Sequence, residues 1–382
     1  THHGERMGEP AFSDYEYLSR QSAFLEQLPE DSLVLMPTNQ VVCRSNDTNF
    51  PFRANSYMLY LCGWSDPEAV LMAHRDGTEW ITTLFVQPRD TKAEIWEGRR
   101  VGVEGAESGW PVNQALSLDD LTETVNSQLH ACGSVYCLTG LNSELDELVE
   151  ASQHEIADPT PLLDDMRVLK SEEEIRIMQE SADIASASHV TAMRATFPGI
   201  GEWQIQSVIE AQFTASRSCW SYPSIVGGGE NATILHYNSN DNEISDGELV
   251  LVDAGCEVSG YASDITRTWP VSGKFSDQQI EIYELVLKAQ LAGIEACQAG
   301  SVWLSMHRAT SAVLAQGLID LGILDCSVEE AIGDDMEFNG PYRNFFMHGT
   351  GHFLGLDVHD VGGGRQGDKD KGPILQPGMV VT

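Results

Sequence analysis

Two aspartates stand in segments that otherwise have the pattern of β-strands. Asp253 ends the run GELVLVD, and because side chains alternate along a strand it shares one face with Leu249 and Leu251 and is predicted to follow that apolar row toward the interior. A turn at Ser259–Gly260 leads into a second segment that carries Asp264. Antiparallel pairing of the two segments would bring the carboxylates together. Two buried carboxylates repel one another, so a cation or hydrogen-bond donors must lie between them.

Each aspartate alone has a simpler interpretation. Asp residues are common at turns and helix caps, and Arg267 stands close enough in the sequence to pair with Asp264. Two aspartates on one predicted hairpin favour a metal site over these structural roles, which stay open as alternatives.

Histidines and glycines are interleaved in NFFMHGTGHFLGLDVHDVG, residues 344–362. His348 and His352 have the i, i+4 spacing of a helical metal pair, but the glycines disfavour a helix and the glutamate of an HExxH motif is missing. The pattern therefore argues against a zincin. Glycines instead indicate close backbone approach to a site, which makes His352 a candidate ligand. His189 and His307 lack such neighbours and are interpreted as ordinary helix or surface residues.

Helices are needed to hold these segments in place. Ser171–Glu174 has the form of a capping box and predicts the start of a helix. Ser276, with Gln279 at the reciprocal position, predicts a second helix that runs to about residue 298. A third helix is predicted over about residues 302–322. The face of the first helix that we expect to be buried comprises Ile175, Met178, Ala182 and Ala185.

The pattern of the chain indicates two domains. Residues 11–165 mix short apolar runs with turns such as Asp76-Gly77, which is typical of an α/β domain, and they carry few obvious catalytic constellations. The pattern changes near Pro159-Thr160-Pro161. Residues 166–382, which hold the aspartates and the histidines, form the second predicted domain.

The second domain contains a faint internal match. A turn glycine followed by an extended apolar run occurs at Gly247 and again at Gly378. If this domain is a duplicated αβ unit, the counterpart of Asp253 is expected at position 384, past the last residue of the sequence.

Composition narrows the possible partners. With 58 acidic and 22 basic residues the formal net charge is -36, which repels phosphate backbones and anionic lipid, so neither nucleic-acid nor membrane partners are expected. The acidic excess is spread along the chain, as on a salt-adapted surface, and suggests a saline or marine bacterial source. No apolar run approaches the length of a membrane span, and the eight cysteines show no CxxC or Cys/His spacing. A cytoplasmic protein is expected.

Six stretches together resemble bacterial aminopeptidase P, of the metallopeptidase family with the pita-bread fold that also holds prolidase, methionine aminopeptidase and creatinase. They are RSNDTNFPFRANS (44–56), AEIWEGRR (93–100), MRVLKSEEEI (166–175), YPSIVGGGENATILHY (222–237), GELVLVDAGCEVSGYASDITRTWPVSGKFS (247–276) and FFMHGTGHFLGLDVHDVG (345–362). The resemblance spans nearly the whole chain. It implies an α/β (α+β) fold class, with an N-terminal creatinase-like α/β domain followed by a C-terminal pita-bread domain that is truncated at its C-terminal end.

The resemblance also implies a function and a site. The expected activity is metal-dependent hydrolysis of the X-Pro bond, by a metal-bridging hydroxide, in peptides with proline in second position. Two divalent metal ions, usually Mn2+ with Zn2+ or Co2+ as substitutes, would be held by Asp253, Asp264, His352 and two glutamates located after residue 382. Oxygen donors with one imidazole and no thiolate suit Mn2+. His236 and His359 would be catalytic and substrate-binding residues that contact the substrate carbonyl and the tetrahedral intermediate. A homo-oligomer, dimer or tetramer, is expected.

Other functions of the same fold remain to be weighed. The nearest enzyme alternative is a prolidase acting on X-Pro dipeptides. An inactive fragment or binding module is a different class, and relatives of that kind lose the ligands that this chain keeps. Creatinase uses the fold without a metal, and the candidate ligands Asp253, Asp264 and His352 in this chain argue against that chemistry. Methionine aminopeptidase lacks a large N-terminal domain such as the one predicted here. The sequence contains no P-loop, dinucleotide loop or GxSxG motif.

Overall fold

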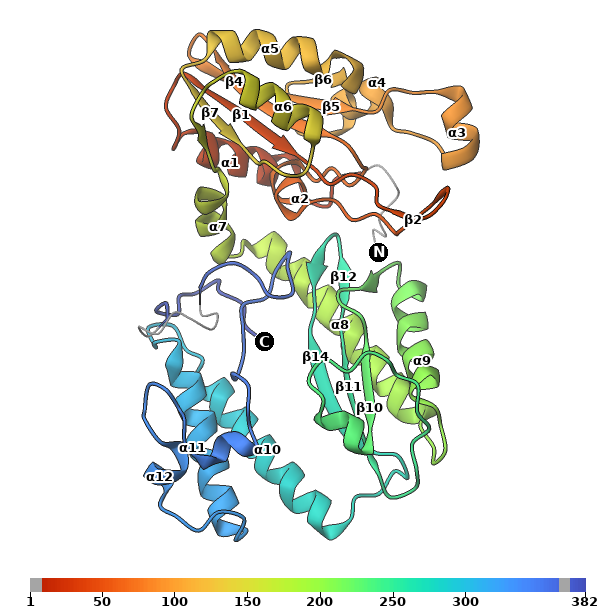
Figure 1. Cartoon of the computed structure of the whole chain (residues 1–382), viewed down its shortest axis with the longest axis vertical. Coiled ribbons are helices and arrows are strands. Elements are labelled where there is room, and N and C mark those ends of the chain that lie inside the picture. The colour runs from red at the N-terminus through yellow and green to blue at the C-terminus, as the bar shows by residue number, and fades with distance from the viewer. Residues whose placement is uncertain (1–8, 364–371) are drawn as a thin grey trace. The chain divides into compact units, whose positions relative to one another are not determined.

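A computed structural model describes residues 9–363 and 372–382, and the chain divides into two compact units, Thr1–Met166 and Arg167–Thr382 (Figure 1). The elements that precede the division are α1 (Asp14–Leu25), β1 (Ser32–Pro37), β2 (Cys43–Ser45), β3 (Thr48–Asn49), α2 (Ser56–Cys62), β4 (Val70–Asp76), β5 (Glu79–Val86), α3 (Thr91–Glu97), α4 (Gly102–Gly109), β6 (Gln114–Ser117), η1 (Leu118–Asp120), α5 (Leu121–Ala131), β7 (Ser134–Cys137), α6 (Ser143–Ala151) and β8 (Ile156–Ala157). Helix α7 (Thr160–Val168) ends this part of the chain.

The first unit is built on a six-stranded mixed sheet with strand order β6-β5-β4-β1-β7-β8. All six residues of β1 are buried, and Leu33 and Leu35 pack with residues of β4, β5, α5 and α6 in one core. The predicted turn at Asp76-Gly77 joins β4 to β5, and Gly77 has a φ of 64° that favours glycine. The prediction of an α/β domain is confirmed.

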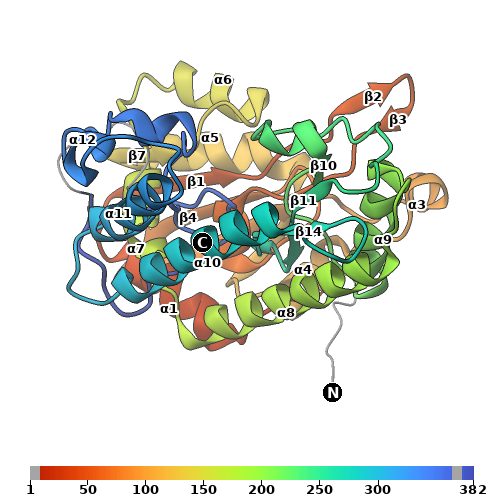
Figure 2. The same ribbon diagram turned by 90° about the horizontal axis from the view of Figure 1, so that it is seen from below.

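The second unit contains two three-stranded antiparallel sheets, with strand orders β10-β11-β14 and β13-β12-β9. Its elements are α8 (Glu172–Ala195), α9 (Glu202–Ala215), β9 (Cys219–Trp220), β10 (Ile225–Gly228), η2 (Gly229–Thr233), β11 (Leu249–Ala254), β12 (Cys256–Val258), β13 (Tyr261–Ala262), β14 (Ile265–Pro270), α10 (Asp277–Ala296), α11 (Leu304–Asp320), α12 (Val328–Ile332) and η3 (Pro341–Asn344). Helices α8 and α9 lie beside the first sheet, while α10 packs along α11 (Figures 1 and 2).

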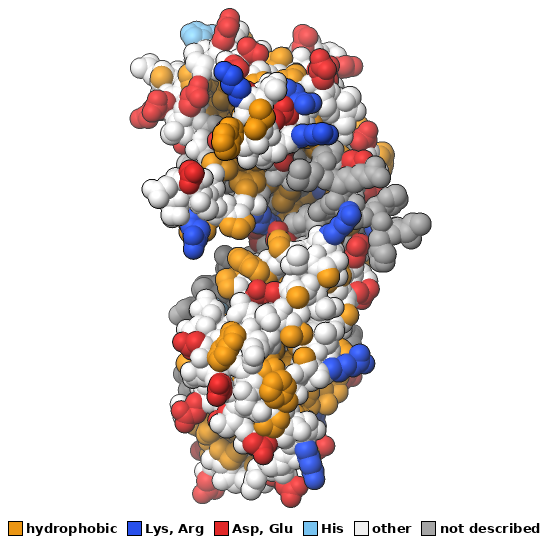
Figure 3. Space-filling view, turned by 90° about the vertical axis from the view of Figure 1, so that its right-hand side faces the viewer, with side chains coloured by type: hydrophobic (Ala, Val, Ile, Leu, Met, Phe, Trp, Pro, Cys, Tyr) orange, Lys and Arg blue, Asp and Glu red, His pale blue; other side chains and the backbone are white. Residues whose placement is uncertain are grey.

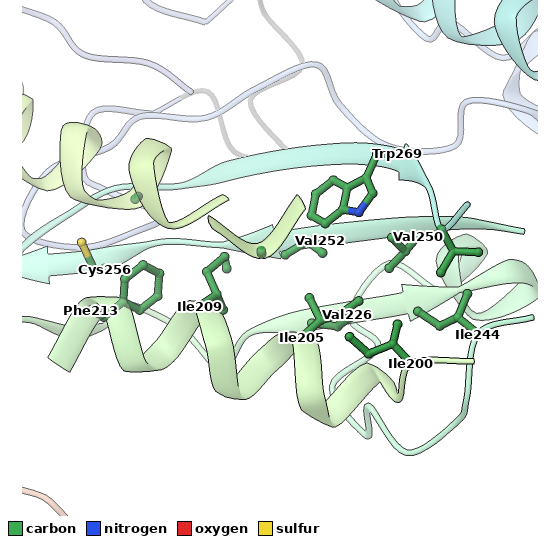
Figure 4. Close-up of a cluster of buried hydrophobic side chains, with 14 residues drawn as sticks. Ile200, Ile205, Ile209, Phe213, Val226, Ile244, Val250, Val252, Cys256 and Trp269 are labelled. Atoms are coloured by element: carbon green, nitrogen blue, oxygen red, sulfur yellow. The ribbon is translucent and has the colours of Figure 1, made fainter. Parts of the chain in front are cut away.

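The core of this unit lies between the sheet β10-β11-β14 and the helices α8 and α9. Ile205, Ile209 and Phe213 of α9 point toward the strands, where Val250 and Val252 of β11 face them (Figure 4). Full burial of each such side chain contributes roughly 1.5–3 kcal/mol. The apolar contacts therefore hold β11 rigidly, together with any polar side chain on its opposite face.

The predicted helix starts are confirmed. The Ser171 hydroxyl accepts from the Glu174 backbone N–H at 3.2 Å, the Glu174 carboxylate accepts from the Ser171 N–H at 3.1 Å, and Ser276 forms the same capping box with Gln279. The predicted third helix corresponds to α11.

The predicted buried face of α8 is only partly right. Met178 and Ala185 are buried, but Ile175 is 44% exposed, so that assignment was wrong. The reason lies at the preceding position, since the Glu174 carboxylate turns inward and accepts a hydrogen bond of 2.6 Å from the Tyr261 hydroxyl. Neighbouring positions on a helix point in different directions, so Ile175 turns outward.

Acidic side chains lie scattered over the face drawn in Figure 3 rather than gathered in one patch. Among the helices that the structure describes, none is both long enough and apolar enough to cross a membrane.

Candidate metal centre

Strand β11 sets the position of Asp253 and corrects one prediction. Asp253 does share a face with Leu249 and Leu251, but that face is half-exposed, and the fully buried face carries Val250 and Val252. The prediction that Asp253 follows the buried row was wrong because the core against α8 and α9 uses the alternate residues. The carboxylate thus lies on the open side of a rigid strand, where a ligand can reach it.

The second carboxylate meets the first through antiparallel pairing of β11 with β14, as predicted. Thr266 lies opposite Asp253 in the register, and Asp264 immediately precedes β14. The predicted turn at Ser259–Gly260 joins β12 to β13. Its φ values of 52° and 83° are both positive, as a two-residue type I′ hairpin turn requires.

A tyrosine that sequence reasoning missed lies between the two carboxylates. The Tyr222 hydroxyl is hydrogen-bonded to Oδ1 of Asp253 and lies 2.9 Å from Oδ1 of Asp264. One hydroxyl carries one proton, so it donates to only one carboxylate at a time. The available signal was weak, because Tyr222 follows β9, and the pairing of β9 with β12 cannot be read from periodicity.

His352 joins the contacts that link Asp253, Tyr222 and Asp264. Its Nε2 lies 3.0 Å from Oδ2 of Asp264, and its Nδ1 donates a hydrogen bond of 2.8 Å to the carbonyl oxygen of Phe353. A carbonyl can only accept, so Nδ1 carries a proton and Nε2 is the nitrogen that can present a lone pair to a metal ion. A backbone partner of this kind is the usual way in which a metal-binding histidine is oriented.

The electrostatics of the cluster favour a cation. Burial raises the pKa of the Asp253 carboxyl, and the neighbouring Asp264 adds to the rise. Burial acts in the same direction on Asp264, but hydrogen bonds from His352 and Tyr222 outweigh it and hold the pKa of Asp264 below its ordinary value. Burial acts to lower the pKa of His352, yet the hydrogen bond to Asp264 raises it overall. The two carboxyls therefore compete for positive partners.

His359 lies beside this cluster. Its ring centroid is 4.2 Å from that of His352, with the ring planes at 57°, and its charge acts on the Asp264 carboxyl. His359 is exposed.

His236 is not brought to the cluster by any contact within the described part of the chain. It is exposed on the segment that follows η2. That segment is tied down by Glu202, whose carboxylate is fully buried and accepts from the backbone N–H groups of Gly228 and Asn242 at 2.8 and 3.0 Å. The Tyr237 hydroxyl donates to the same carboxylate at 2.7 Å. Sequence reasoning did not identify Glu202 as the anchor of the loop that carries His236.

His348 makes contacts to its neighbours in the chain. Its Nδ1 contacts the carbonyl oxygen of Gly349 at 2.7 Å, and its ring meets Phe346 edge-on.

The backbone of His352 pairs with the segment that contains Thr382. The backbone N–H and C=O of His352 both pair with Thr382, each at 3.0 Å, and the Thr382 hydroxyl donates to the backbone oxygen of Asp264 at 3.0 Å. Gly378, which begins this segment, has a φ of 95°, close to the 85° of Gly247 before β11. The two turn glycines that suggested an internal repeat thus share a left-handed conformation.

The three predicted ligands fit a divalent ion by chemistry rather than by present geometry. Across residues 9–363 and 372–382, no group of three or more His, Cys, Asp and Glu side chains is arranged to hold a metal ion. Tyr222 is hydrogen-bonded to Asp253 and Asp264, and His352 pairs with Asp264. Two carboxylates and an imidazole with an oriented Nε2 are nevertheless the donors that a hard divalent cation prefers. Burial and the adjacent Asp264 raise the pKa of Asp253, so a cation at this place would stabilise the ionised carboxylate.

Comparison with known proteins identifies relatives of both units. Residues 176–382 match the model of metallopeptidase family M24, and residues 17–136 match that of the aminopeptidase P N-terminal domain. The Xaa-Pro aminopeptidase of Haemophilus influenzae is 42% identical over 373 residues, which cover 96% of this chain and 84% of the relative. That of Escherichia coli is 38% identical, over 97% of this chain and 86% of the relative. A solved structure of zinc-substituted E. coli aminopeptidase P in complex with product has a TM-score of 0.91 at 37% identity, and covers 97% of this chain and 86% of its own.

Proposed function

The chain belongs to metallopeptidase family M24, and from that premise we propose that Asp253, Asp264 and His352 are ligands of its metal ions. The observation that carries the proposal is the unbroken set of contacts from Asp253 through Tyr222 to Asp264 and on to His352. Side chains from two strands and a glycine-rich loop meet at one place on the open side of a rigid sheet.

The family and the relatives make this protein a metal-dependent aminopeptidase that acts on the X-Pro bond of peptides with an N-terminal X-Pro sequence. The expected fold class is confirmed, with an aminopeptidase P N-terminal domain followed by a pita-bread domain.

Divalent metal ions follow from the family, and we infer that the site takes two of them, Mn2+ by preference. Carboxylate-rich donor sets suit Mn2+, and Zn2+ or Co2+ can replace it. When bound, such ions polarise a carbonyl and supply hydroxide at neutral pH. The protein contributes the ligands and their orientation by Tyr222 and by the Phe353 carbonyl.

His359 and His236 are proposed as the residues that bind substrate. His359 is supported by its ring contact with His352 and by its exposure, and an imidazole at this place can donate to a substrate carbonyl and to the developing oxyanion. His236 is supported by its place on a loop that Glu202 anchors to the same sheet. An X-Pro bond has no N–H to recognise, so donors to the carbonyl carry the recognition of the reacting bond.

The domain bounds, the oligomeric state and the cellular location are proposed as well. We propose that residues 11–165 form the N-terminal aminopeptidase P domain, that residues 166–382 form the metallopeptidase domain, and that the enzyme works as a homo-oligomer. All eight cysteines are free thiols, which is usual for a cytoplasmic protein and supports that location.

The experiment that tests the proposed function compares substrates and metals. The chelator-treated protein, reloaded in turn with Mn2+, Zn2+ and Co2+, is assayed on the tripeptide Arg-Pro-Pro and on the dipeptide Gly-Pro. We expect release of arginine from the tripeptide, fastest with Mn2+, and little action on the dipeptide. Cleavage of the dipeptide alone would make the enzyme a prolidase. Unchanged metal content in Asp264→Asn and His352→Ala would refute the ligand assignment.

A further inference from the structure

Three charged side chains form a buried ion cluster beneath the loop that carries His352 and His359. Oδ1 of Asp360 accepts from Nη2 of Arg167 at 2.8 Å, and Oδ2 accepts from Nζ of Lys170 at 2.6 Å. The three side chains are 1–2% exposed. A buried ion cluster is weak evidence for stability, because desolvation offsets most of the attraction between the charges. Its location is the more informative property.

The Asp360 carboxylate lies inside the loop. The backbone N–H of Asp360 donates to the carbonyl oxygen of Phe353 at 3.0 Å, which closes the loop between His352 at one end and His359 at the other. A Cβ atom built on Gly355 would lie 2.3 Å from Oδ2 of Asp360, so the carboxylate takes the space that a side chain would need. A side chain at position 355 would therefore displace either this carboxylate or the backbone of the loop.

Lys170 also connects the cluster to the segment that pairs with the backbone of His352. Its Nζ also donates to the carbonyl oxygen of Arg167 at 2.8 Å, and its backbone N–H donates to the carbonyl oxygen of Gly378 at 2.8 Å. The segment that follows Gly378 pairs with His352 through Thr382. One lysine thus holds the loop by its side chain and the pairing segment by its backbone.

We propose that Asp360, Lys170 and Arg167 are positioning residues of the metal centre. Their ion cluster fixes the loop, so that the imidazoles of His352 and His359 stay beside Asp264. The inference rests on the proposed function, and it adds residues that touch neither metal nor substrate. Side chains that orient metal ligands in this indirect way typically change metal affinity or activity by about 10–100-fold.

Two substitutions disturb the cluster in different ways. Asp360→Asn removes the only carboxylate that pairs with Lys170 in the described residues, while Arg167 keeps Asp357 at 2.8 Å, and the buried lysine charge destabilises the unit. Gly355→Ala keeps every charge and pushes the Asp360 carboxylate aside, so it carries the test if Asp360→Asn does not fold. For each folded variant, calorimetric titration of the metal-free protein with Mn2+ should show affinity weakened by about 10–100-fold. Steady-state assays on Arg-Pro-Pro should show a lower kcat with KM close to that of the wild type.

Matched controls separate positioning from general stability. Gly349→Ala lies in the same glycine-rich stretch, and its added Cβ has no atom within 4 Å, so we expect wild-type affinity and kcat. Glu16→Gln breaks another well-buried ion pair, 2.9 Å from Arg20 in the first unit, and should lower the melting temperature without changing Mn2+ affinity.

Failure of the positioning role and failure of the metal centre itself give different results. If folded Gly355→Ala or Asp360→Asn binds Mn2+ and turns over as the wild type does, the positioning role is overturned. An equal loss of affinity in Glu16→Gln would overturn it as well. A wild-type protein that binds no metal would instead overturn the proposed metal centre itself.

Discussion

Nε2 of His352 lies 3.0 Å from Oδ2 of Asp264, and the two residues reach this contact from a glycine-rich loop and from the start of a β-strand. Tyr222 extends the contact to Asp253. The polar groups of the proposed metal centre thus satisfy one another in the structure, and a metal ion has to replace these contacts with its own. Several properties of the enzyme depend on this exchange.

Asp253→Asn should separate metal binding from stability. Burial and the neighbouring Asp264 make a negative charge at Asp253 costly, so the neutral amide should leave the melting temperature of the metal-free protein unchanged or higher. The wild type should gain stability on adding Mn2+, by about 2.7 kcal/mol at a hundredfold excess over Kd, and the variant should gain none. Differential scanning calorimetry with and without Mn2+ measures both effects. Asp183→Asn, on the exposed face of α8, is the control and should keep the full gain.

Tyr222→Phe should weaken the metal-free protein more than the loaded one. The hydroxyl relieves repulsion between two carboxylates, and a hydrogen bond to a charged group contributes about 1.5–3 kcal/mol. With metal bound, the cation takes over that task, so the loss of unfolding free energy should be smaller. Urea denaturation of both forms gives the comparison, and equal losses would contradict a bridging role for the hydroxyl.

Glu202→Gln should affect both the stability and the substrate affinity. The buried carboxylate accepts two backbone N–H groups, the Tyr237 hydroxyl and the Asn231 amide, and the amide of glutamine cannot accept from all of them. We expect a loss of about 2–3 kcal/mol in unfolding free energy. KM should rise in the remaining folded enzyme, because the His236 loop loses its anchor. The half-exposed Glu210, on the same helix, provides the control, since Glu210→Gln should change stability by less than about 0.5 kcal/mol.

His307 should make the protein acid-sensitive. Its ring nitrogens contact the hydroxyls of Thr350 at 2.8 Å and Tyr342 at 3.2 Å. Burial, followed by the nearby charges of Arg343 and His348, lowers the pKa of His307 from 6.5 to about 4. Between these values the unfolded chain binds a proton that the folded protein does not. The stability contributed by the neutral ring is therefore fully present above pH 6.5 and is lost as the pH falls toward about 4.

The size of this pH effect can be measured by comparison with His307→Gln. Because the ring is partly accessible, we expect about 1–2 kcal/mol after solvent screening. Urea denaturation at about pH 7 and about pH 4.5 should show a larger loss for the wild type than for the variant. Parallel losses in the two proteins would mean that His307 does not contribute.

The net charge of -36 should make stability depend on salt. Like charges spread over the surface repel one another, and added salt screens that repulsion. The melting temperature of the wild type should rise steadily from about 0.05 M to about 1 M NaCl, where the screening length falls from more than 10 Å to about 3 Å. A flat profile would remove the argument for a salt-adapted surface.

Local signals in the sequence were sufficient for much of the fold. Serine followed three positions later by Glu or Gln located the starts of α8 and α10, because a capping box involves only near neighbours. The Ser259–Gly260 turn and the alternation along β11 were read in the same way. These features do not depend on the rest of the chain.

Features set by tertiary packing could not be read from the sequence. Alternation shows that Asp253 and Val252 lie on opposite faces of β11, but which face is buried depends on where α9 packs. Tyr222 and Glu202 act through partners far away in the sequence. His307, interpreted as an ordinary helix or surface residue, lies on a helix but belongs to a hydrogen-bonded network with Tyr342 and Thr350.

The pairing of His352 with Thr382 has a consequence for biosynthesis. A ribosome makes His352 well before Thr382, so the nascent chain carries the histidine while its backbone still lacks this partner. Donors that are not yet ordered bind metal poorly, because the affinity of a site includes the free energy of folding it. Metallation should therefore follow synthesis of the segment that contains Thr382, because His352 lacks this backbone partner until then.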